Sequence, residues 1–595
     1  MTAPDRSRFP YWNPNLAVND RVEDLLQRMT VAEKAGVMFQ DMILMGADGE
    51  LAEAVPHFDM PSNKDLLHTK QMSHFNVIGP INDARLAAKW HNKIQREASK
   101  TRLGIPVTLA TDPRNHFTDN VGTGFRAGIF SQWPETLGFA ALRSPELVRE
   151  FANIARQEYL AVGLRLALHP QVDLATEPRW SRIGASFGED ADLTSELVAA
   201  YIQGFQGPEL GSDSVSTMTK HFPGGGPQKD GEDPHFEYGR EQVYPGDNLA
   251  YHLKPFKAAI DAGTAQIMPY YGMPVKTQYE EVGFAFNKAI ITQLLREELG
   301  FEGIVCTDWG LLTDKPILGQ PMPARAWGVE HLTRAQRLQR ILDAGCDQLG
   351  GETCPEVLCG LVSDDLVSER RIDQSVRRLL REKFLLGLFD QPFVDEDRAA
   401  HIVGNAEFSR LGNITQRRSY TLLTNKGNCL PLAGHNSVKY YVEGIPENVM
   451  AARGLTVVSH PKEADVALLR LKAPYEPRPG AFEALFHAGS LEFSPEEQLR
   501  QKNIYQSVPV AIVDVYVDRP AVIPEIVDEA TAVLISYGST ADAFLDILFN
   551  VYRPEGKLPF DLPSSMKAVQ KSRSDVPYDT EDPVFRFGHG LSYAS

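Results

Sequence analysis

The chain has 595 residues, of which 43% are apolar and 23% are charged. A chain of this length exceeds what one hydrophobic core supports, so we expect a globular protein of two or three domains. Its formal net charge of −18 argues against binding to nucleic acid or to an anionic membrane surface, because both would repel it. The charge says nothing about a neutral substrate.

Cysteine content and the first residues predict a compartment. The five cysteines are few and odd in number, which argues against a disulfide framework and favours a reducing environment. No second cysteine pair or histidine cluster accompanies Cys354 and Cys359, so we assign no metal site. The N-terminal segment lacks the apolar core of a signal peptide, and no stretch reaches the roughly 18 apolar residues of a membrane span. We therefore expect a cytoplasmic protein.

The first 390 residues alternate between helical and strand patterns. Residues 20–29 have helical spacing, and Thr30 with Glu33 forms a capping-box pattern that starts a second helix. The clearest strands lie at 105–112, 164–170, 265–271 and 303–308. Because this alternation is typical of a β/α barrel, we predict a TIM-barrel-like catalytic domain over residues 1–390. Eight strands cannot be counted from the pattern alone.

A second α/β unit is predicted after an acidic stretch. Residues 391–415 have few strand signals and are interpreted as a linker. Strands separated by helical patterns follow at 437–444, 455–459, 466–473, 509–517 and 532–538. They predict a smaller doubly wound sheet, an α/β sandwich domain over residues 416–563. The polar tail, residues 564–595, is expected to pack back on the body.

The most informative stretch is Gly303-Ile-Val-Cys-Thr-Asp-Trp-Gly310. A short apolar run that ends on Asp308 and Trp309 fits a central parallel strand, buried on both faces. Its last side chains would then lie at the carboxyl edge of the strands, where such folds keep their chemistry. The pattern favours Asp308 as a nucleophile beside an aromatic wall. The alternative is an aspartate that caps the next helix or turns the loop.

Three further polar clusters follow predicted strand ends. They are Asp112, the segment with Glu177, Arg179 and Arg182, and the pair Lys220-His221 before three glycines. In a barrel all of them converge on one face, where charged groups suit sugar hydroxyls and an indole suits the apolar face of a pyranose.

Each of these clusters also has a structural interpretation. Asp112 could cap a helix, and Arg179 could form an ion pair with Glu189 or Asp190. The glycines after Lys220 lack the order of a phosphate-binding loop, which makes that interpretation unfavourable.

Seven sequence blocks carry a resemblance to a known family. In chain order they are RVEDLLQRMTVAEKAG, EPRWSRIGASFGED, KHFPGGG, CTDWG, LLTNKGNCLPL, PEGKLPFDLP and FRFGHGLSY. They resemble the signatures of glycoside hydrolase family 3, the β-glucosidase family, with Glu177 in place of the usual aspartate and Ser181 in place of glycine. The resemblance runs nearly end to end and implies the two-domain form, without the fibronectin-like domain of many relatives.

What the resemblance implies is a retaining, exo-acting β-glucosidase that releases glucose from the non-reducing end of β-glucosides. Asp308 would form a covalent glycosyl-enzyme, which divides one difficult displacement into two easier ones. The residues expected to hold the terminal sugar are Asp112, Arg179, Lys220, His221 and Tyr270, with Trp309 at the subsite entrance. Neither a metal nor an organic cofactor is expected. The substrates would be short β-linked gluco-oligosaccharides or glucosides of plant aglycones.

The general acid is less clearly marked. In the family it is usually a glutamate lent by the second domain. An alignment on Pro474-Tyr475 puts this position at Lys472, a poor acid, whereas an alignment on residues 491–498 puts it within one residue of Glu483. We therefore favour Glu483, with Glu476 and Glu492 as alternatives.

A fourth candidate acid lies in the first domain. A family branch that releases N-acetylglucosamine uses an Asp-x-His dyad in a similar loop, and Asp233-Pro234-His235 fits that pattern in part. A second-domain acid must come about 5–5.5 Å from Asp308, so residues 474–492 are expected to lean over the barrel mouth.

A β-xylosidase, a β-N-acetylglucosaminidase and an inactive sugar-binding protein remain alternative functions. The sequence leaves a homodimer open.

Overall fold

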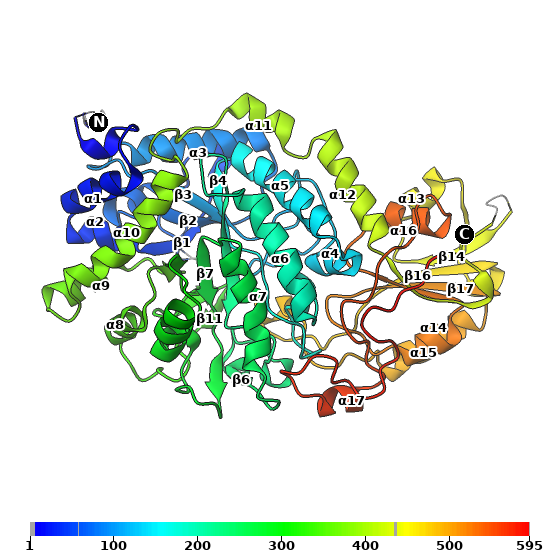
Figure 1. Ribbon diagram of the computed structural model, residues 1–595. Helices are drawn as coiled ribbons and strands as arrows, with labels where there is room; N and C mark the ends of the chain where they lie inside the picture. The colour runs from blue at the N-terminus through cyan, green and yellow to red at the C-terminus, as the bar shows by residue number, and fades with distance from the viewer. Residues whose placement is uncertain (1–5, 7, 57–58, 434–436, 594–595) are drawn as a thin grey trace.

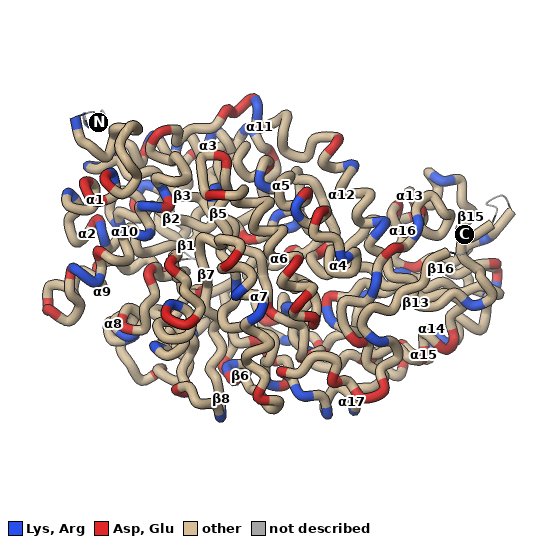
Figure 2. Tube along the Cα trace, in the orientation of Figure 1, with Lys and Arg blue, Asp and Glu red and all other residues tan. Residues whose placement is uncertain are grey.

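The computed structural model describes residues 6, 8–56, 59–433 and 437–593. Two sheets dominate it (Figure 1), an eight-stranded sheet in the blue-to-green part of the chain and a six-stranded sheet in the yellow-to-red part. Acidic and basic residues are interspersed along the whole trace rather than gathered in one block (Figure 2).

The first sheet is a parallel barrel. Its strands are β1 (Phe39–Ile43), β2 (His74–Val77), β3 (Thr108–Thr111), β4 (Leu164–Ala167), β5 (Ser216–Phe222), β7 (Gln266–Pro269), β9 (Ile304–Val305) and β12 (Leu349–Gly350). Their order is β12-β1-β2-β3-β4-β5-β7-β9, with every pairing parallel. A parallel bridge between Cys306 and Gln348 joins the two edges. The predicted barrel is confirmed, and none of these strands is reversed.

Helices surround the barrel. They are α1 (Val18–Arg28), α2 (Val31–Val37), α3 (Ala84–Ala98), α4 (Thr136–Leu142), α5 (Pro145–Ala161), α6 (Ala191–Gln206), α7 (Leu249–Asp261), η9 (Ala289–Glu298), α8 (Arg334–Ala344), α9 (Pro355–Ser363) and α10 (Glu369–Leu385). The predicted capping box is present, because Thr30 accepts from the Glu33 amide while the Glu33 carboxylate accepts from the Thr30 amide.

Two short two-stranded sheets complete the first part of the chain. They pair β6 (Glu241–Val243) with β8 (Met273–Val275) and β10 (Lys315–Ile317) with β11 (Gln320–Met322).

The second sheet has the order β13-β18-β17-β16-β14-β15. The strands are β13 (Thr421–Asn425), β14 (Lys439–Glu443), β15 (Thr456–Val457), β16 (Val466–Lys472), β17 (Val510–Tyr516) and β18 (Ala532–Ser536), and the helices are α13 (Glu447–Ala452), α14 (Pro495–Tyr505), α15 (Pro524–Glu529) and α16 (Ala541–Leu548). All five predicted strands are present. The edge strand β13, which pairs antiparallel with β18, was not predicted.

Two helices connect the sheets. The stretch interpreted as a linker contains α11 (Glu396–Ile402), which packs on α3 and α5, and most of α12 (Ala406–Arg418), which packs on α16. After α17 (Met566–Lys571) the tail returns to the barrel, where the Asp575 carboxylate accepts from the amides of Gly246 and Asn248 at 2.8 and 2.9 Å.

Over the described ranges, the helices are all too short or too polar to span a membrane.

Candidate active site

Asp308 lies just beyond β9, at the carboxyl end of the barrel strands. Its Oδ1 accepts from the Trp309 amide at 2.9 Å, and the residue is only 7% exposed. Its Oδ2 has no hydrogen-bond partner among the described residues, and the nearest opposing nitrogen is His221 Nε2 at 4.0 Å. Because a buried polar atom without a partner is costly, this oxygen is available to a ligand.

Two tyrosines follow β7 beside this carboxylate. The Tyr270 ring lies 4.5 Å from the His221 ring, and its buried hydroxyl has no partner in the described part of the chain. The Tyr271 hydroxyl lies 3.0 Å from both the amide and the carbonyl of Trp309. Burial and the nearby Asp308 carboxylate raise the pKa of Tyr271 well above its usual value. Of these two tyrosines, only Tyr270 was predicted from the sequence as a sugar contact.

Trp309 forms one wall of the site. The indole is partly exposed and packs against the apolar side chains of the barrel interior. Its Nε1 is buried without a partner among the described residues.

Asp112 and Lys220 form a buried ion pair across the strand ends. Lys220 Nζ lies 3.0 Å from Asp112 Oδ1, and Asn76 Nδ2 donates to Asp112 Oδ2 at 3.0 Å. A paired ammonium and carboxylate present donors and acceptors together, as adjacent sugar hydroxyls require.

His221 is fixed by a carboxylate that the sequence analysis missed. Asp173 Oδ2 accepts from His221 Nδ1 at 2.8 Å, and Asp173 Oδ1 accepts from the His221 amide at 3.1 Å. Burial, with the nearby Arg182 charge, lowers the pKa of His221 well below its usual value. The ring is therefore neutral, with its proton on Nδ1, and Nε2 accepts from Arg182 Nη1 at 3.2 Å.

Asp173 provides a pH-dependent prediction. Burial raises the pKa of Asp173 to about 6, so its protonation removes the acceptor that orients His221. We expect kcat/KM to fall as the pH drops below about 6, and Asp173→Asn to lower kcat/KM about 100-fold at neutral pH.

The free energy of unfolding should change with pH in the opposite direction to kcat/KM. Between the ordinary value of 3.8 and about 6, the folded protein binds more protons at Asp173 than the unfolded chain does, so unfolding free energy decreases as the pH rises. Between pH 4.5 and pH 7.5, the difference in unfolding free energy between Asp173→Asn and wild type should therefore shift in favour of the variant by on the order of 1–2 kcal/mol, as measured by urea unfolding. A pH-independent difference would contradict this assignment.

Arg182, rather than Arg179, faces the cluster. Burial alone would lower the pKa of Arg182, but the acidic groups of Tyr270, Asp233 and Asp308 raise it above its usual value. The Arg179 guanidinium instead forms a bidentate ion pair with Glu177, at 2.8 and 3.0 Å. The ion pair that the sequence analysis considered, with Glu189 or Asp190, is therefore replaced by one with Glu177.

His235 and Asp233 form an oriented pair at the barrel mouth. His235 Nδ1 lies 2.6 Å from Asp233 Oδ1, and Ser181 donates to Asp233 Oδ2 at 2.8 Å. Burial alone would raise the pKa of Asp233, but His235, through charge and hydrogen bonds, and the charge of Arg182 together outweigh it, so the pKa lies below its usual value. The His235 ring packs edge-on against the Tyr271 ring, with centroids 4.6 Å apart.

The second-domain loop covers this pair, as the sequence predicts. The Phe486 and Phe482 rings lie 4.7 and 5.8 Å from the His235 ring. Asn120 Nδ2, on the barrel, donates to the Leu485 carbonyl at 2.9 Å. Residues 474–492 therefore close one side of the barrel mouth.

The Glu483 carboxylate, on the same loop, contacts other residues. Its Oε1 accepts from the Tyr238 hydroxyl at 3.0 Å, and its Oε2 accepts from the Gly480 amide at 3.2 Å. Both oxygens therefore have partners outside the Asp308 cluster.

The other two glutamates also have partners of their own. Glu476 Oε1 accepts from the Ser490 amide at 3.1 Å, and Glu492 Oε1 accepts from the Met566 amide at 3.0 Å. Glu492 thus lies against the start of α17. The structure brings neither carboxylate into the Asp308 cluster.

Arg519 joins the barrel to the covering loop. It is fully buried, and its guanidinium donates to the carbonyls of Arg179 and Pro474 at 3.0 and 2.9 Å and of Gly489 at 3.3 Å. One side chain therefore holds a barrel loop and both ends of the segment that packs on His235.

We expect Arg519→Met to lower the free energy of unfolding by about 3 kcal/mol, because three buried carbonyls lose their donor. Arg519→Lys should fall in between, since a lysine cannot reach all three acceptors. The matched control is Arg500→Met on α14, which removes exposed ion pairs and should cost less than about 1 kcal/mol. Urea unfolding measures all three, and equal losses for Arg519→Met and Arg500→Met would refute the role.

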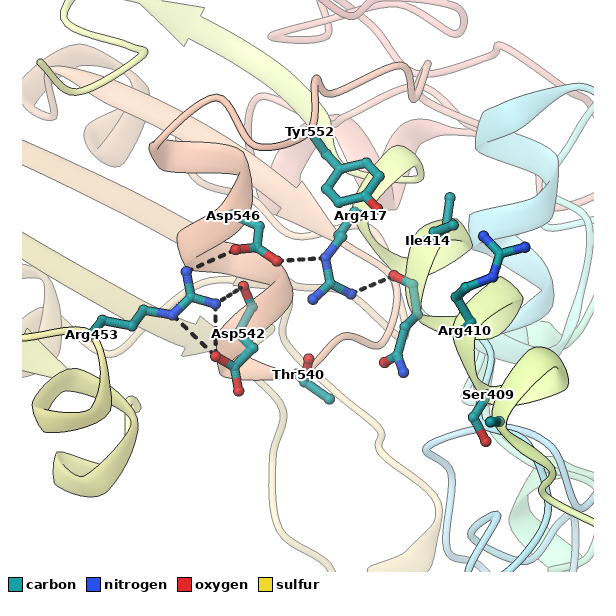
Figure 3. A pocket seen from close by; sticks show the side chains of 11 residues that line it. Ser409, Arg410, Ile414, Arg417, Arg453, Thr540, Asp542, Asp546 and Tyr552 are labelled. Atoms are coloured by element: carbon teal, nitrogen blue, oxygen red, sulfur yellow. Dashed lines mark hydrogen bonds and ion pairs between the residues drawn. The ribbon is translucent and has the colours of Figure 1, made fainter.

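A groove of about 630 Å³ between α12, α13 and α16 is separate from this cluster. Four of its charged side chains pair with one another, because Arg453 pairs with Asp542 and Asp546, and Arg417 pairs with Asp546 (Figure 3). Within the described residues, His, Cys, Asp and Glu side chains form no group of three that could hold a metal ion.

Comparison with known proteins identifies the family. The N-terminal domain of glycosyl hydrolase family 3 matches residues 34–382, and its C-terminal domain matches residues 441–593. The chain belongs to glycosyl hydrolase family 3. It is 59% identical to a protein of Emericella nidulans named beta-glucosidase C, over 98% of this chain and 94% of that one. It is 41% identical to the periplasmic beta-glucosidase/beta-xylosidase of Dickeya chrysanthemi, over 98% and 91%.

Solved structures of two β-glucosidases share the fold. A β-glucosidase of Erythrobacter marinus superposes with a TM-score of 0.81 at 21% identity, covering 99% of this chain and 85% of that one. A β-glucosidase of Listeria innocua in complex with glucose gives a TM-score of 0.76 at 21% identity, covering 97% and 83%.

Proposed function

We propose that this family 3 enzyme is a retaining, exo-acting β-glucosidase that releases glucose through a covalent intermediate on Asp308. The family membership and the 59% identical relative named beta-glucosidase C support this activity. The observation that carries the mechanism is Asp308 Oδ2, which is buried, has no hydrogen-bond partner among the described residues and lies 4.0 Å from His221 Nε2. This oxygen would attack the anomeric carbon while the glycosidic bond breaks.

The terminal sugar would be held by Asp112, Lys220, His221, Tyr270 and Trp309, as the resemblance implies. We transfer the role expected of Arg179 to Arg182, because Arg182 donates to His221 and faces Asp308. Arg179 then supports the loop through its ion pair with Glu177.

For the general acid we propose His235 in place of Glu483. An imidazolium at His235, stabilised by Asp233 on Nδ1, holds a proton on Nε2. In the first step this proton goes to the leaving oxygen. In the second step Nε2 takes a proton from the water that attacks the glycosyl-enzyme. Support comes from the contact of His235 with Tyr271 and from the other partners of Glu483.

The activity is tested with nitrophenyl β-glucoside, β-xyloside and β-N-acetylglucosaminide. We expect the highest kcat/KM on the glucoside. A preference for either other sugar would assign the enzyme to the alternative activity, and the Dickeya relative, named for both glucosidase and xylosidase, makes the xyloside the informative comparison. No turnover on any of them would favour a sugar-binding protein.

Two further proposals concern the domain boundaries and the cellular compartment. We divide the chain into a catalytic domain (1–390), a linker (391–415), an α/β domain (416–563) and a tail (564–595), which limited proteolysis near residue 391 would test. We place the protein in the cytoplasm, supported by five unpaired cysteines, and cell fractionation would test that placement.

A further inference from the structure

Four buried apolar side chains form a cluster at the barrel mouth that is separate from the main core. They are Phe236, Met322, Phe482 and Phe486, each no more than 6% exposed. The first two lie in the N-terminal domain of the family, and the other two lie in its C-terminal domain, on the covering loop, residues 474–492. This cluster therefore joins the two domains through side chains.

The two rings of the covering loop pack on His235. The Phe486 ring lies 4.7 Å from the His235 ring at an interplanar angle of 40°, and the Phe482 ring lies edge-on at 5.8 Å. The two phenylalanine rings also contact each other, with centroids 5.2 Å apart. Both touch Gly122 on the barrel, where an added Cβ would lie 3.2 Å from Phe482 and 3.3 Å from Phe486. The rings are therefore in close contact with the barrel domain at two places.

A hydrogen bond alone does not fix the orientation of the His235 ring. Its Nδ1 lies 2.6 Å from Asp233 Oδ1, which constrains one atom and still lets the ring plane tilt about that bond. Nε2, the other ring nitrogen, has no hydrogen-bond partner among the described residues. The ring contacts of Tyr271, Phe482 and Phe486 therefore supply the remaining constraint. A catalytic group misplaced by about 1 Å can cost about 10²-fold in rate, so this constraint bears on catalysis.

We propose that Phe486 is a positioning residue for the general acid, and that the covering loop serves the reaction through this ring rather than through a carboxylate. Phe486 holds the His235 imidazole in the orientation from which Nε2 reaches the leaving oxygen. The inference rests on the proposed function, in which His235 is the acid. It makes catalysis depend on the docking of the covering loop, which Asn120 Nδ2 supports by donating to the Leu485 carbonyl at 2.9 Å.

The test compares kcat/KM on cellobiose, whose leaving glucose needs a proton, with kcat/KM on a dinitrophenyl β-glucoside, whose leaving group needs none. Phe486→Leu keeps an apolar side chain but removes the ring. We expect it to lower the cellobiose value about 10-fold and the dinitrophenyl value less than about twofold. Equal losses on both substrates would indicate only a structural role and would overturn the proposal.

Phe493→Leu is the matched control for Phe486→Leu. Phe493 follows the covering loop in the chain and packs on the main core rather than on His235. The same substitution there should leave the ratio of the two kcat/KM values within about twofold of wild type. A cellobiose-specific loss in this variant would show that the loss in Phe486→Leu does not come from contact with His235.

A double variant shows whether Phe486 acts through His235. If it does, adding Phe486→Leu to His235→Ala should lower kcat/KM on cellobiose by less than about a further twofold, because the oriented group is already absent. If Phe486 instead contacted the leaving glucose itself, the full tenfold loss would persist in the double variant. That result would contradict the positioning role.

A further variant weakens the docking of the covering loop from the barrel side. Asn120→Asp keeps the acceptor for the Gly122 amide, now at 2.9 Å, but replaces the donor to the Leu485 carbonyl by an oxygen. We expect the same cellobiose-specific loss, about fivefold. Unchanged cellobiose values in both Asn120→Asp and Phe486→Leu would overturn the proposal.

Failure of the proposed function has a different signature. If His235→Ala hydrolysed cellobiose as well as wild type does, His235 would not be the acid, and the positioning role would fail with it. A cellobiose-specific loss in His235→Ala without one in Phe486→Leu would refute the positioning role alone.

Discussion

Asp308→Asn is expected to lower kcat/KM on aryl β-glucosides by about 10⁴-fold or more, because the amide cannot form the glycosyl-enzyme. Among the described residues, Oδ2 of Asp308 is buried and has no hydrogen-bond partner, so the replacement removes a desolvated charge and breaks none of the hydrogen bonds of that oxygen to them. The melting temperature should therefore stay equal or rise. Steady-state kinetics and thermal unfolding check the two halves of this expectation.

The stereochemistry of azide rescue provides the control. In Asp308→Gly, azide enters the space of the missing carboxylate and displaces a β-linked leaving group with inversion, so the expected product is the α-glucosyl azide. Full activity in Asp308→Asn, or a β-glucosyl azide from Asp308→Gly, would contradict the assignment.

His235→Ala is expected to lower kcat/KM on cellobiose by about 10²- to 10⁴-fold, because the leaving glucose needs a proton. A dinitrophenyl β-glucoside, whose leaving group needs none, should lose less than about tenfold. Azide should raise the turnover of the variant and yield the β-glucosyl azide, since it attacks the glycosyl-enzyme from the face that the leaving group left.

Glu483→Gln and Glu476→Gln are the matched controls for His235→Ala. Their carboxylates accept hydrogen bonds from Tyr238, Gly480 and Ser490, so we expect changes below about threefold on both substrates. A loss confined to cellobiose in either glutamine variant, together with near-normal activity of His235→Ala, would return the acid to the second domain.

The barrel was predictable because its parallel strands are buried on both faces and are nearly continuous apolar runs. In β5 every residue is buried. The edge strand β13 was not predicted, since it follows α12 directly and its burial decreases along its length. The stretch 391–415 lacked strand signals, but its helical character depends on packing against α3, α5 and α16.

The candidate site was predictable where a residue ends a strand. Asp112 and Asp308 follow β3 and β9, Lys220 lies near the end of β5, and the barrel brings all three to one edge. Arg179 and Arg182 are three residues apart in an irregular loop, so no periodicity indicates which of them faces inward.

Residues that orient other residues were harder to predict. Asp173 acts through His221, and Tyr271 acts through Trp309. Their partners come from other strands, so only the folded chain shows these pairs. One available signal was that Asp173 follows a predicted strand closely, as the other site residues do.

The most direct measurement is to trap the intermediate with 2-deoxy-2-fluoro-β-glucosyl fluoride. Fluorine at C2 slows both steps through their oxocarbenium-like transition states, while the good leaving group lets the first step proceed, so the glycosyl-enzyme accumulates. Peptide mass spectrometry should find the fluoroglucosyl adduct on Asp308, and Asp308→Asn should remain unlabelled. An adduct on another carboxylate, or inactivation of wild type without an adduct on Asp308, would contradict the mechanism.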